Sequence, residues 1–450
     1  MIALCATFVS HDDPRPIVPL THVCRYWRRA ITSSPRNWAS ISIGWKRLVP
    51  LCLERAGAVN LTVNITVSEI GGTFLKALSP HVSRISHLSL TGYSSIEEAA
   101  DIPASPMPNL TSLELEQTTQ PAKSFPSNET PAPPLFQNVS KLKSLRLTRI
   151  PLYPAVFSIT SLVELKLVGY TTPFHFGKFI RFLRSNPDLE VIVLDIQFVE
   201  GPAWIFPARV LSLARLRQLS FTCARAIDSK GLISSISFPR GVFLELFSSQ
   251  ANPDTDFRLF LPSPPTKVRE LLNPITTIKY HNTGCTGGRE VHLSGNDSHF
   301  SLRCSNTSFN LDSVFSLFNT TAVREFHAMD HPCRESLSRP LSRLPALEAL
   351  VLVDNVTYFP IHSLDFLVEE PVLCPSLKTI ALFDCDLVPW ITRELEEVVT
   401  KRKNSTAAWL HRVVIFRRDG KLPDYKLLQR LRQFIPRVDV RIDEDLPDLP

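Results

Sequence analysis

The sequence of 450 residues lacks the signals of several protein classes. No stretch approaches the roughly 18 uninterrupted apolar residues of a membrane-spanning helix, so we expect no membrane partner. The opening MIALCATFVS is apolar, but it has no basic flank and soon meets Asp12 and Asp13, unlike a secretory signal. We therefore expect an intracellular protein, cytoplasmic or nuclear, whose 44% of hydrophobic residues can form a large core.

Regular cysteine spacing is also missing. The nine cysteines are odd in number and include no C-x-x-C pair. Reduced, mostly buried thiols fit this pattern better than a disulfide framework does. Triplets such as Asn60-Leu61-Thr62 would accept glycans only in a secreted chain, so a secreted repeat receptor is the third and least favoured interpretation.

Catalytic motifs are absent as well. The sequence has no G-x-S-x-G, no H-E-x-x-H and no phosphate-binding loop ending in Gly-Lys-Ser/Thr. His327, His331 and Cys333 lie close together, but they lack the second ligand pair of a zinc site, and we assign them a structural or surface role. We expect no catalytic residue, no cofactor, no metal and no enzyme activity.

Charge of one sign is not concentrated anywhere. The formal net charge of +6 arises from 49 basic and 43 acidic residues spread along the chain. Arg25, Arg28, Arg29 and Arg36 form one cluster, which a solvated helix face explains better than phosphate binding does. We expect no nucleic-acid partner.

A helical motif is present in residues 19–41, PLTHVCRYWRRAITSSPRNWASI. Apolar side chains recur there at i, i+3, i+4, i+7 and i+11, at Leu20, Val23, Cys24, Trp27 and Ile31. This spacing predicts one amphipathic helix. Ser33, Ser34 and Pro35 end the helix, since proline removes a donor and disfavours helical angles before it, and Trp38 with Ile41 begins a second short apolar face.

This motif resembles the second and third helices of an F-box, in the form seen in many fungal proteins, where V-C-R-x-W-R-x-I/A precedes S/T-P-x-x-W. Residues 52–65, CLERAGAVNLTVNI, resemble the junction that follows, with Cys52 in place of a tryptophan. In that family the F-box binds the adaptor Skp1 and attaches the chain to a cullin-based ubiquitin ligase. The resemblance implies docking to a Skp1-like adaptor through seven residues: Leu20, Val23, Cys24, Trp27, Ile31, Pro35 and Trp38.

The first F-box helix departs from the family pattern. The family opens with Leu-Pro, whereas we interpret Met1-Ile2-Ala3-Leu4 as lying inside that helix, with Ile2, Leu4, Cys5 and Phe8 as its tail. Two interpretations stay open: the gene model has lost its start, or the protein carries a degraded F-box.

A repeat is the second organising signal. Apolar residues occur at i, i+3 and i+5 in the segments 84–90, 109–115, 141–147, 161–167, 188–194, 215–221, 322–328, 346–352, 376–382 and 409–415, and weakly near Val438 and Val440. The i+3 residues Leu88, Leu113, Leu145, Leu165, Ile192 and Leu219 are 25, 32, 20, 27 and 27 positions apart. Leucine-rich repeats have periods of about 20–29 residues.

The repeat pattern predicts stacked strands. In a strand the i+3 and i+5 side chains share one face, and stacked repeats bury that face together. Helical spacing occurs between strands at Phe176, Phe179, Ile180 and Leu183, and again at Ile391, Leu395, Val398 and Val399. We predict an α/β fold: a small amino-terminal F-box-like helical module, then an irregular leucine-rich-repeat solenoid of parallel strands with helices or turns on the convex side. The alternative is an ordinary α/β domain with coincidental leucines.

The predicted domains follow from these two signals. They are a helical module with a truncated first helix at 1–45, a linking helix at 46–60 that Gly57 ends, a solenoid at 61–443 and an acidic tail at 444–450. Proline-rich loops interrupt the solenoid near 117–138 and 250–266. Alternation between Ile275 and Cys304 predicts shorter strands with turns at glycines.

Outward strand positions are the candidate target-binding surface. The early ones are partly charged: Glu114, Arg146, Glu164, Lys166, Val191, Val193 and Gln218. The later ones, such as Ala349, Val351, Ala381 and Val414, are small and apolar. We predict a polar end that biases encounter and a drier end that anchors the target.

Two function classes follow. The favoured one is a substrate-recognition subunit of a Skp1-cullin-F-box ubiquitin ligase, which binds an unknown protein target and is monomeric outside the complex. The other is a stand-alone repeat scaffold for protein binding, in which a degenerate F-box only caps the first strand.

Overall fold

The computed structural model describes residues 21–42, 47–66, 77–93, 107–118, 136, 139–150, 154–170, 174–198, 210–223, 225–248, 260–261, 270, 272–282, 289–295, 299–304, 311–329, 334–353, 364–383, 389–417 and 423–442. Several predictions lie outside these residues. They concern the first helix, Leu20, His331, Cys333, most of the two proline-rich segments and the acidic tail.

The chain is α/β and divides into two compact units, Met1–Leu219 and Ser220–Pro450. All described strands except β8 (Leu211–Ser212) and β10 (Ile236–Ser237) belong to mostly parallel sheet structure, 17 strands over both units. None of the helices in the described ranges has the length and apolar content to cross a lipid bilayer.

The first unit is a parallel sheet whose strands follow chain order. Each strand from β1 to β7 pairs in parallel with the next. The strands are β1 (Ser40–Ser42), β2 (Leu61–Thr66), β3 (Ile85–Tyr93), β4 (Ser112–Gln117), β5 (Ser144–Thr148), β6 (Glu164–Val168), β7 (Val191–Asp195) and β9 (Gln218–Cys223), the last spanning the division between the units. The helices are α3 (Arg25–Thr32), α4 (Val49–Ala56) and α7 (Phe176–Arg184), with 3-10 turns η1 (Pro35–Trp38), η4 (Ser79–Arg84) and η6 (Pro154–Ser158).

The leucine pattern fixes the register of this sheet. Leu113, Leu145 and Leu165 are partners on successive strands, and all three are fully buried. The residue after each of these leucines lies on the accessible side of the sheet. In the register, Glu114 is opposite Arg146, and Arg146 is opposite Lys166. The predicted strands and their shared register are therefore confirmed in this unit.

The strand β1 was not predicted. Ile41 was expected to belong to a second apolar face after Trp38, but it lies in β1, is fully buried and pairs with Val63 of β2. The interpretation of Trp38 and Ile41 as one face was wrong because the chain turns from a 3-10 turn into an extended strand at Ser40.

Helix α7 packs beside the strands as its spacing predicted. Phe179, Ile180 and Leu183 are buried, and the ring of Phe176 meets that of Phe198 edge to face with centroids 5.1 Å apart. Asn186 follows the helix and is buried. Its Oδ1 accepts from Leu162 N–H at 2.9 Å, and its Nδ2 donates to the carbonyl oxygens of Ile159 at 2.8 Å and Phe182 at 3.0 Å. One buried amide thus provides a hydrogen-bond partner to three backbone groups.

The second unit begins with a departure from the parallel array. β13 (Arg289–Ser294) runs antiparallel to both β12 (Thr277–Asn282) and β14 (His299–Cys304), while β11 (Phe243–Ser248) pairs with β14 in parallel. The short strands predicted at 275–304 are present, but the expectation of parallel strands was wrong here. Only six residues separate β12 from β13 and four separate β13 from β14, whereas a parallel pair requires a crossover of about a dozen residues or more.

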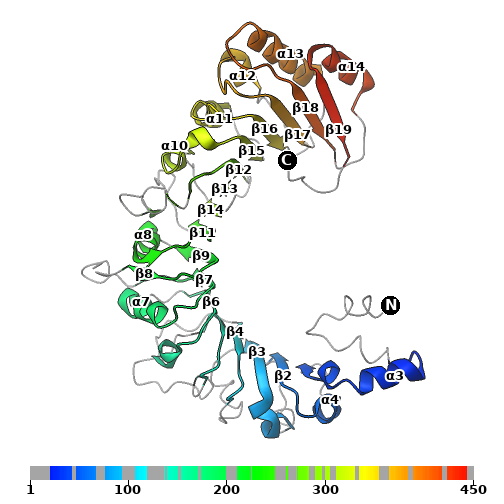
Figure 1. Cartoon of the computed structure of the whole chain (residues 1–450), viewed down its shortest axis with the longest axis vertical. Coiled ribbons are helices and arrows are strands. Elements are labelled where there is room, and N and C mark those ends of the chain that lie inside the picture. The colour runs from blue at the N-terminus through cyan, green and yellow to red at the C-terminus, as the bar shows by residue number, and fades with distance from the viewer. Residues whose placement is uncertain are drawn as a thin grey trace. The chain divides into compact units, whose positions relative to one another are not determined.

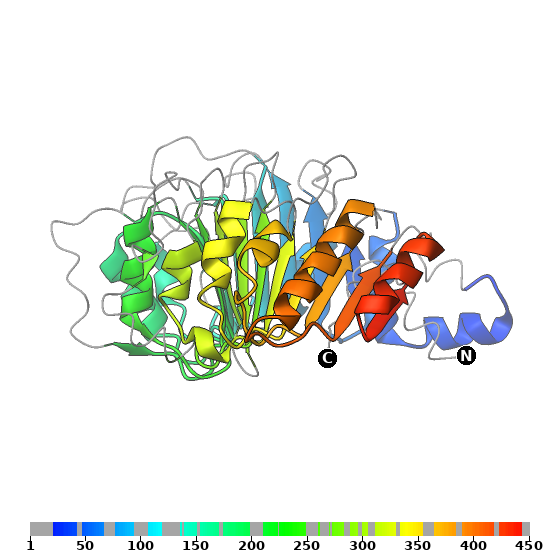
Figure 2. The ribbon, with the colours of Figure 1, turned by 90° about the horizontal axis from the view of Figure 1, so that it is seen from above.

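The parallel array continues from β12. It runs through β15 (Glu325–Met329), β16 (Ala349–Val353), β17 (Thr379–Phe383), β18 (Arg412–Phe416) and β19 (Arg437–Arg441). The helices of this unit are α8 (Ala226–Ser235), α10 (Leu311–Phe315), α11 (Arg334–Leu341), α12 (Asp365–Glu369), α13 (Pro389–Lys403) and α14 (Tyr425–Phe434), with the turn η9 (Thr320–Ala322). Helices α10 to α14 lie along one side of these strands (Figure 1), and α13 and α14 contact each other (Figure 2).

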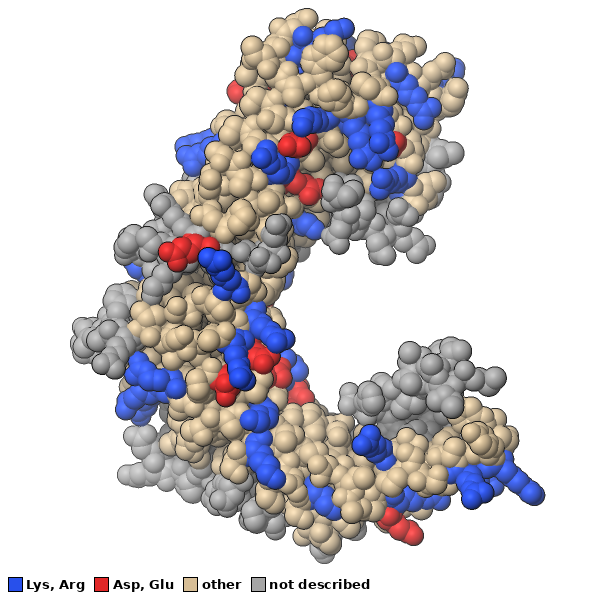
Figure 3. Space-filling view, viewed as in Figure 1, with Lys and Arg blue, Asp and Glu red and all other residues tan. Residues whose placement is uncertain are grey.

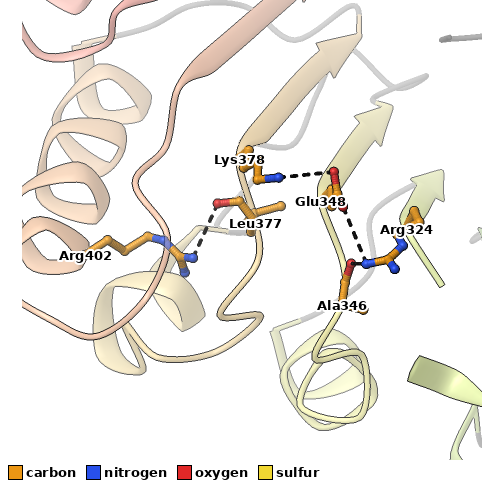
Figure 4. A network of polar contacts seen from close by, with 6 residues as sticks. All are labelled: Arg324, Ala346, Glu348, Leu377, Lys378 and Arg402. Carbon is orange, nitrogen blue, oxygen red and sulfur yellow. Dashed lines mark hydrogen bonds and ion pairs between the residues drawn. The ribbon is translucent and has the colours of Figure 1, made fainter. Parts of the chain in front are cut away.

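A buried arginine organises the loops beneath these strands. Arg402 at the end of α13 is fully buried and donates to five carbonyl oxygens, those of Pro371, Leu373, Cys374, Leu377 and Ala408. Closer to the surface, Glu348 joins Arg324 at 3.5 Å and Lys378 at 3.4 Å (Figure 4). Side-chain contacts thus link successive strands where they begin.

The later outward positions are not exposed. Val351, Ala381 and Val414 are fully buried in a cluster with Val353, Phe383 and Phe416, whose last two rings stack with centroids 3.9 Å apart. The prediction of a dry anchoring surface was therefore wrong at these three positions, because β16 to β18 are buried on both faces beyond their first residues, whereas Ala349 at the start of β16 is partly accessible.

Candidate docking surface

The start of α3 is set by a cysteine. Cys24 has extended backbone angles, its Sγ accepts from Trp27 N–H at 3.5 Å, and its carbonyl oxygen accepts from Arg28 N–H at 3.0 Å. The helix therefore begins at Arg25, and the prediction of a helix from Leu20 was wrong at this end. A side-chain cap that satisfies a first-turn N–H stops the helix from extending backward.

The end of α3 agrees with the sequence. Ser33 caps the helix through its N–H to Arg29 O at 3.0 Å, and Pro35 opens the turn η1. Because proline fixes φ without needing a donor, it suits the first position of such a turn. The turn η1 ends at Trp38, which packs against α3.

Trp38 joins three segments. Only 3% of the residue is exposed, and its indole Nε1 donates to Ile31 O at 3.0 Å. The guanidinium carbon of Arg55, from α4, lies 4.4 Å from the ring centroid. This cation–π contact and the hydrogen bond fix α3 and α4 on either side of η1.

Helix α4 closes the helical region against the sheet. Val49, Cys52, Leu53 and Ala56 are buried along one side, and α4 contacts β1. Gly57 ends the helix with φ of 56°, a conformation that glycine adopts without steric cost. Burial raises the pKa of the Cys52 thiol, with the charge of Arg55 opposing this in part, so Cys52 packs as a neutral apolar group.

The predicted adaptor-docking residues separate into two groups. Ile31 and Trp38 are buried and hold the region together. Val23 is 64% exposed, Cys24 is exposed and Trp27 is partly exposed; we call these three residues the adaptor face. Pro35 is exposed on η1, and Leu20 lies outside the described residues. The expectation that Leu20, Val23, Cys24, Trp27 and Ile31 form one helix face therefore applies only in part, because Val23 and Cys24 precede α3.

Exposed positive charge borders the adaptor face. Arg25, Arg28, Arg29 and Arg36 are all exposed, and Arg28 Nε donates to Thr21 O at 2.9 Å. This last contact holds the turn before α3 against the helix. Tyr26, which precedes Trp27 in the sequence and is 74% exposed, adds an aromatic side chain that the apolar spacing did not identify.

A second candidate surface lies on the accessible side of β4 to β7. Its charged side chains pair along and across strands: Arg146 Nη1 lies 3.2 Å from Glu114 Oε1, Lys166 pairs with Glu164, and Ser144 donates to Glu164 at 2.9 Å. Val193 neighbours Lys166, and Val191 neighbours Glu164. We call Glu114, Arg146, Glu164, Lys166, Val191 and Val193 the strand face.

The charges of the strand face are mutually compensated. Burial by itself would raise the pKa of Glu164, but the hydrogen bonds from Lys166 and Ser144 and the charges of Lys166 and Arg146 lower it. Glu164 therefore stays ionised and pairs with Lys166, while Arg146 pairs with Glu114. Gln218 of β9 is also partly accessible, and its N–H donates to Glu190 O at 3.1 Å. All seven predicted positions are accessible to a partner, and their role in binding stays a prediction.

Of the three residues considered as metal ligands from the sequence, only His327 is among the described residues. Within the described ranges, no group of three or more His, Cys, Asp or Glu residues is placed to hold a metal ion. His327, one of the three residues considered from the sequence, is buried with Nε2 at 2.9 Å from Glu325 Oε1.

The comparisons with known proteins give no family assignment. No protein-family model matches this chain, and no curated protein matches it either.

Proposed function

We propose that this protein is a substrate-recognition subunit of a Skp1-cullin-F-box ubiquitin ligase. In this proposal the helical region of α3, η1 and α4 docks to a Skp1-like adaptor, and a leucine-rich-repeat-like array of strands holds a protein target. Ubiquitin transfer is catalysed elsewhere in the complex.

One observation carries the proposal: α3 is anchored at one end and accessible at the other. The carbonyl oxygen of Ile31 accepts from Trp38, whereas Trp27 in the first turn of α3 and Val23 just before the helix remain accessible. Accessible apolar side chains grouped on a fixed helix are typical of a protein interaction site. The F-box resemblance of residues 19–41 names the partner.

Co-expression with a Skp1-like adaptor tests this function. We expect the purified chain to retain the adaptor in a stable complex, and Val23→Glu to lose it, because a charge would be buried at the contact. Val210→Glu is the matched control, since Val210 is 45% exposed in the same unit but lies far along the chain. Failure of the folded wild-type chain to retain the adaptor would contradict the proposal.

The strand face is proposed to bind the target. Its Glu114–Arg146 and Glu164–Lys166 pairs offer both charge signs next to two valines, which suits a surface that first orients a protein and then contacts it. Proximity labelling in cells should yield fewer labelled targets with the Arg146→Glu, Lys166→Glu double variant while adaptor retention is unchanged. An unchanged set of targets would remove the strand face from the proposal.

A stand-alone scaffold is the second candidate. It is favoured by the continuity of the helical region with the sheet: β1 extends the sheet beyond β2, and α4 packs on β1, as a capping element would. This candidate predicts a folded chain that binds targets through the strand face without any adaptor.

A further inference from the structure

The last two strands of the second unit carry three arginines around one carboxylate. Arg412 of β18 is the register partner of Arg437 in β19, and Phe416 is the partner of Arg441. Side chains two residues apart share a face of a strand, so Arg437, Asp439 and Arg441 lie on the same side as Arg412. Figure 3 shows Lys and Arg side chains gathered over this part of β18 and β19. We call Arg412, Arg437, Asp439 and Arg441 the basic edge.

Asp439 ties two of the arginines together. Its Oδ2 lies 2.7 Å from Arg412 Nε and 2.9 Å from Arg437 Nε. The side chain of Arg412 is mostly buried, whereas that of Arg437 is 64% exposed. The guanidinium carbon of Arg441 lies 5.6 Å from the ring centroid of Phe416. This cation–π contact holds the third arginine on the same side of the sheet.

The basic edge keeps an excess of positive charge. Burial alone would raise the pKa of Asp439, but the hydrogen bonds from Arg437 and Arg412 outweigh it and lower the pKa. Asp439 is therefore ionised and holds the arginines in place without neutralising them. A guanidinium has five N–H donors, and the exposed side chain of Arg437 therefore has donors beyond the Nε–H that pairs with Asp439.

We propose that the basic edge binds an acidic segment of a protein partner. Arg437 and Arg441 are four residues apart on an extended strand, about 13 Å, and Arg412 lies one strand spacing of about 4.8 Å from Arg437. Carboxylates at alternate positions of an extended peptide repeat every 7 Å or so and can reach these guanidiniums in charge-assisted pairs. Charge complementarity and this spacing along a strand are the grounds for an acidic peptide, and a nucleic acid is tested below as a competing ligand. This inference goes beyond the proposed function and does not depend on adaptor binding.

Fluorescence anisotropy with a labelled peptide of glutamates tests the inference on the full-length chain at low salt. We expect the peptide to bind, a glutamine peptide of the same length not to bind, and the affinity to fall as salt screens the charges. The Arg437→Glu, Arg441→Glu double variant is expected to weaken binding by about ten-fold or more. Arg432→Glu makes the same kind of charge change on α14 and is expected to alter the affinity by less than about two-fold, because the charge is exposed and screened.

Three results would overturn the proposal. They are equal binding of the glutamine peptide, unchanged affinity in the double variant, and displacement of the peptide by a single-stranded oligonucleotide of equal charge at equal or lower concentration. If the double variant does not fold, Arg437→Gln provides the same test, because that side chain is exposed and its loss leaves the core intact. This single variant is expected to weaken binding by about three-fold, and an unchanged affinity again contradicts the proposal.

Discussion

The indole Nε1 of Trp38 donates a hydrogen bond to the carbonyl oxygen of Ile31 over 3.0 Å. This contact joins the turn η1 to the last turn of α3, and Arg55 covers the ring from α4. Trp27 in the first turn of α3 and Val23 in the turn before the helix remain accessible. The side chains that hold this helix of eight residues are thus distinct from those that can contact a partner.

Replacing Trp38 with alanine is expected to lower the free energy of unfolding by about 3 to 5 kcal/mol, because a buried indole and its contacts are lost. Trp38→Phe should cost about 1 to 3 kcal/mol, since it keeps much of the ring but loses the buried hydrogen bond to Ile31 O. Urea unfolding measures both. Trp409→Ala, at a residue 53% exposed, is the control and should cost under about 1 kcal/mol. Equal losses at the two tryptophans would contradict this account of the helical region.

Asn186→Ala is expected to destabilise the first unit by about 2 to 4 kcal/mol, because Leu162 N–H and the carbonyl oxygens of Ile159 and Phe182 lose a buried partner. Asn186→Asp should not rescue it, since a carboxylate cannot donate to the two carbonyls. Asn109→Ala, whose bonds to Ser83 and Lys141 are exposed, is the control and should cost under about 1 kcal/mol. Urea unfolding distinguishes them, and a stable Asn186→Ala protein would be the contrary result.

Arg402→Met is expected to cost more than about 4 kcal/mol or to prevent folding of the second unit, because five carbonyl oxygens lose one buried donor group. Arg393→Met is the control on the same helix: that side chain is exposed and pairs with Glu397, so the loss should stay under about 1 kcal/mol. Thermal unfolding and limited proteolysis report the difference. Indistinguishable melting of the two variants would show that the carbonyl cluster is not a structural requirement.

The carboxyl of Glu394 in α13 should make stability fall as pH rises. Burial, the neighbouring Asp365 and the charge of Glu397 raise its pKa from 4.5 to about 7. The folded state therefore binds this proton more tightly than the unfolded state does. The resulting stabilisation is complete below pH 4.5 and is lost as pH increases to about 7.

Glu394→Gln keeps a neutral side chain at every pH and tests this sign. The variant should melt at a higher temperature than the wild type at about pH 8 and at a similar temperature at about pH 4.5. Asp365→Asn should remove part of the same pH dependence, because it removes the neighbouring charge. A constant difference between Glu394→Gln and wild type across this range would contradict the account.

The strand positions of the first unit could be read from the sequence because its leucines recur in one register. Leu113, Leu145 and Leu165 define that register, and alternation then assigns Glu114 and Arg146 to the other face. The strand β11 of the second unit was not predicted, because glycine at position 241 occupies the i position of the i, i+3, i+5 pattern. The buried apolar residue lies one position later, at Val242. β1 escaped because three residues are too few to show alternation.

The covered face of the second unit had a signal that was not used. The segments ALVLV of β16, TIALF of β17 and VVIF within β18 are almost continuously apolar, which is typical of strands buried on both faces. Val351 and Ala381 were assigned to a binding surface because alternation shows only on which side of a strand a residue lies. Whether the residue is buried depends on what packs against that side.

The candidate docking residues were found by spacing, but their division into two groups was not. Ile31 and Trp27 are both apolar, so the sequence does not show which of them is buried. The buried end of α3 is the one that Trp38 contacts, and Trp38 is itself covered by Arg55, which is distant in the sequence. The helix start was misplaced because cysteine is not among the usual capping residues, yet Cys24 accepts the N–H of Trp27.

Hydrogen–deuterium exchange of the full-length chain with and without a Skp1-like adaptor tests the central claim most directly. The account predicts that the adaptor slows exchange in the segment from Thr21 to Thr32, which carries the adaptor face, and leaves the strand face unchanged. Protection that is absent from this segment, or that appears only on the strands β4 to β7, would contradict the claim that α3 is the adaptor-docking element.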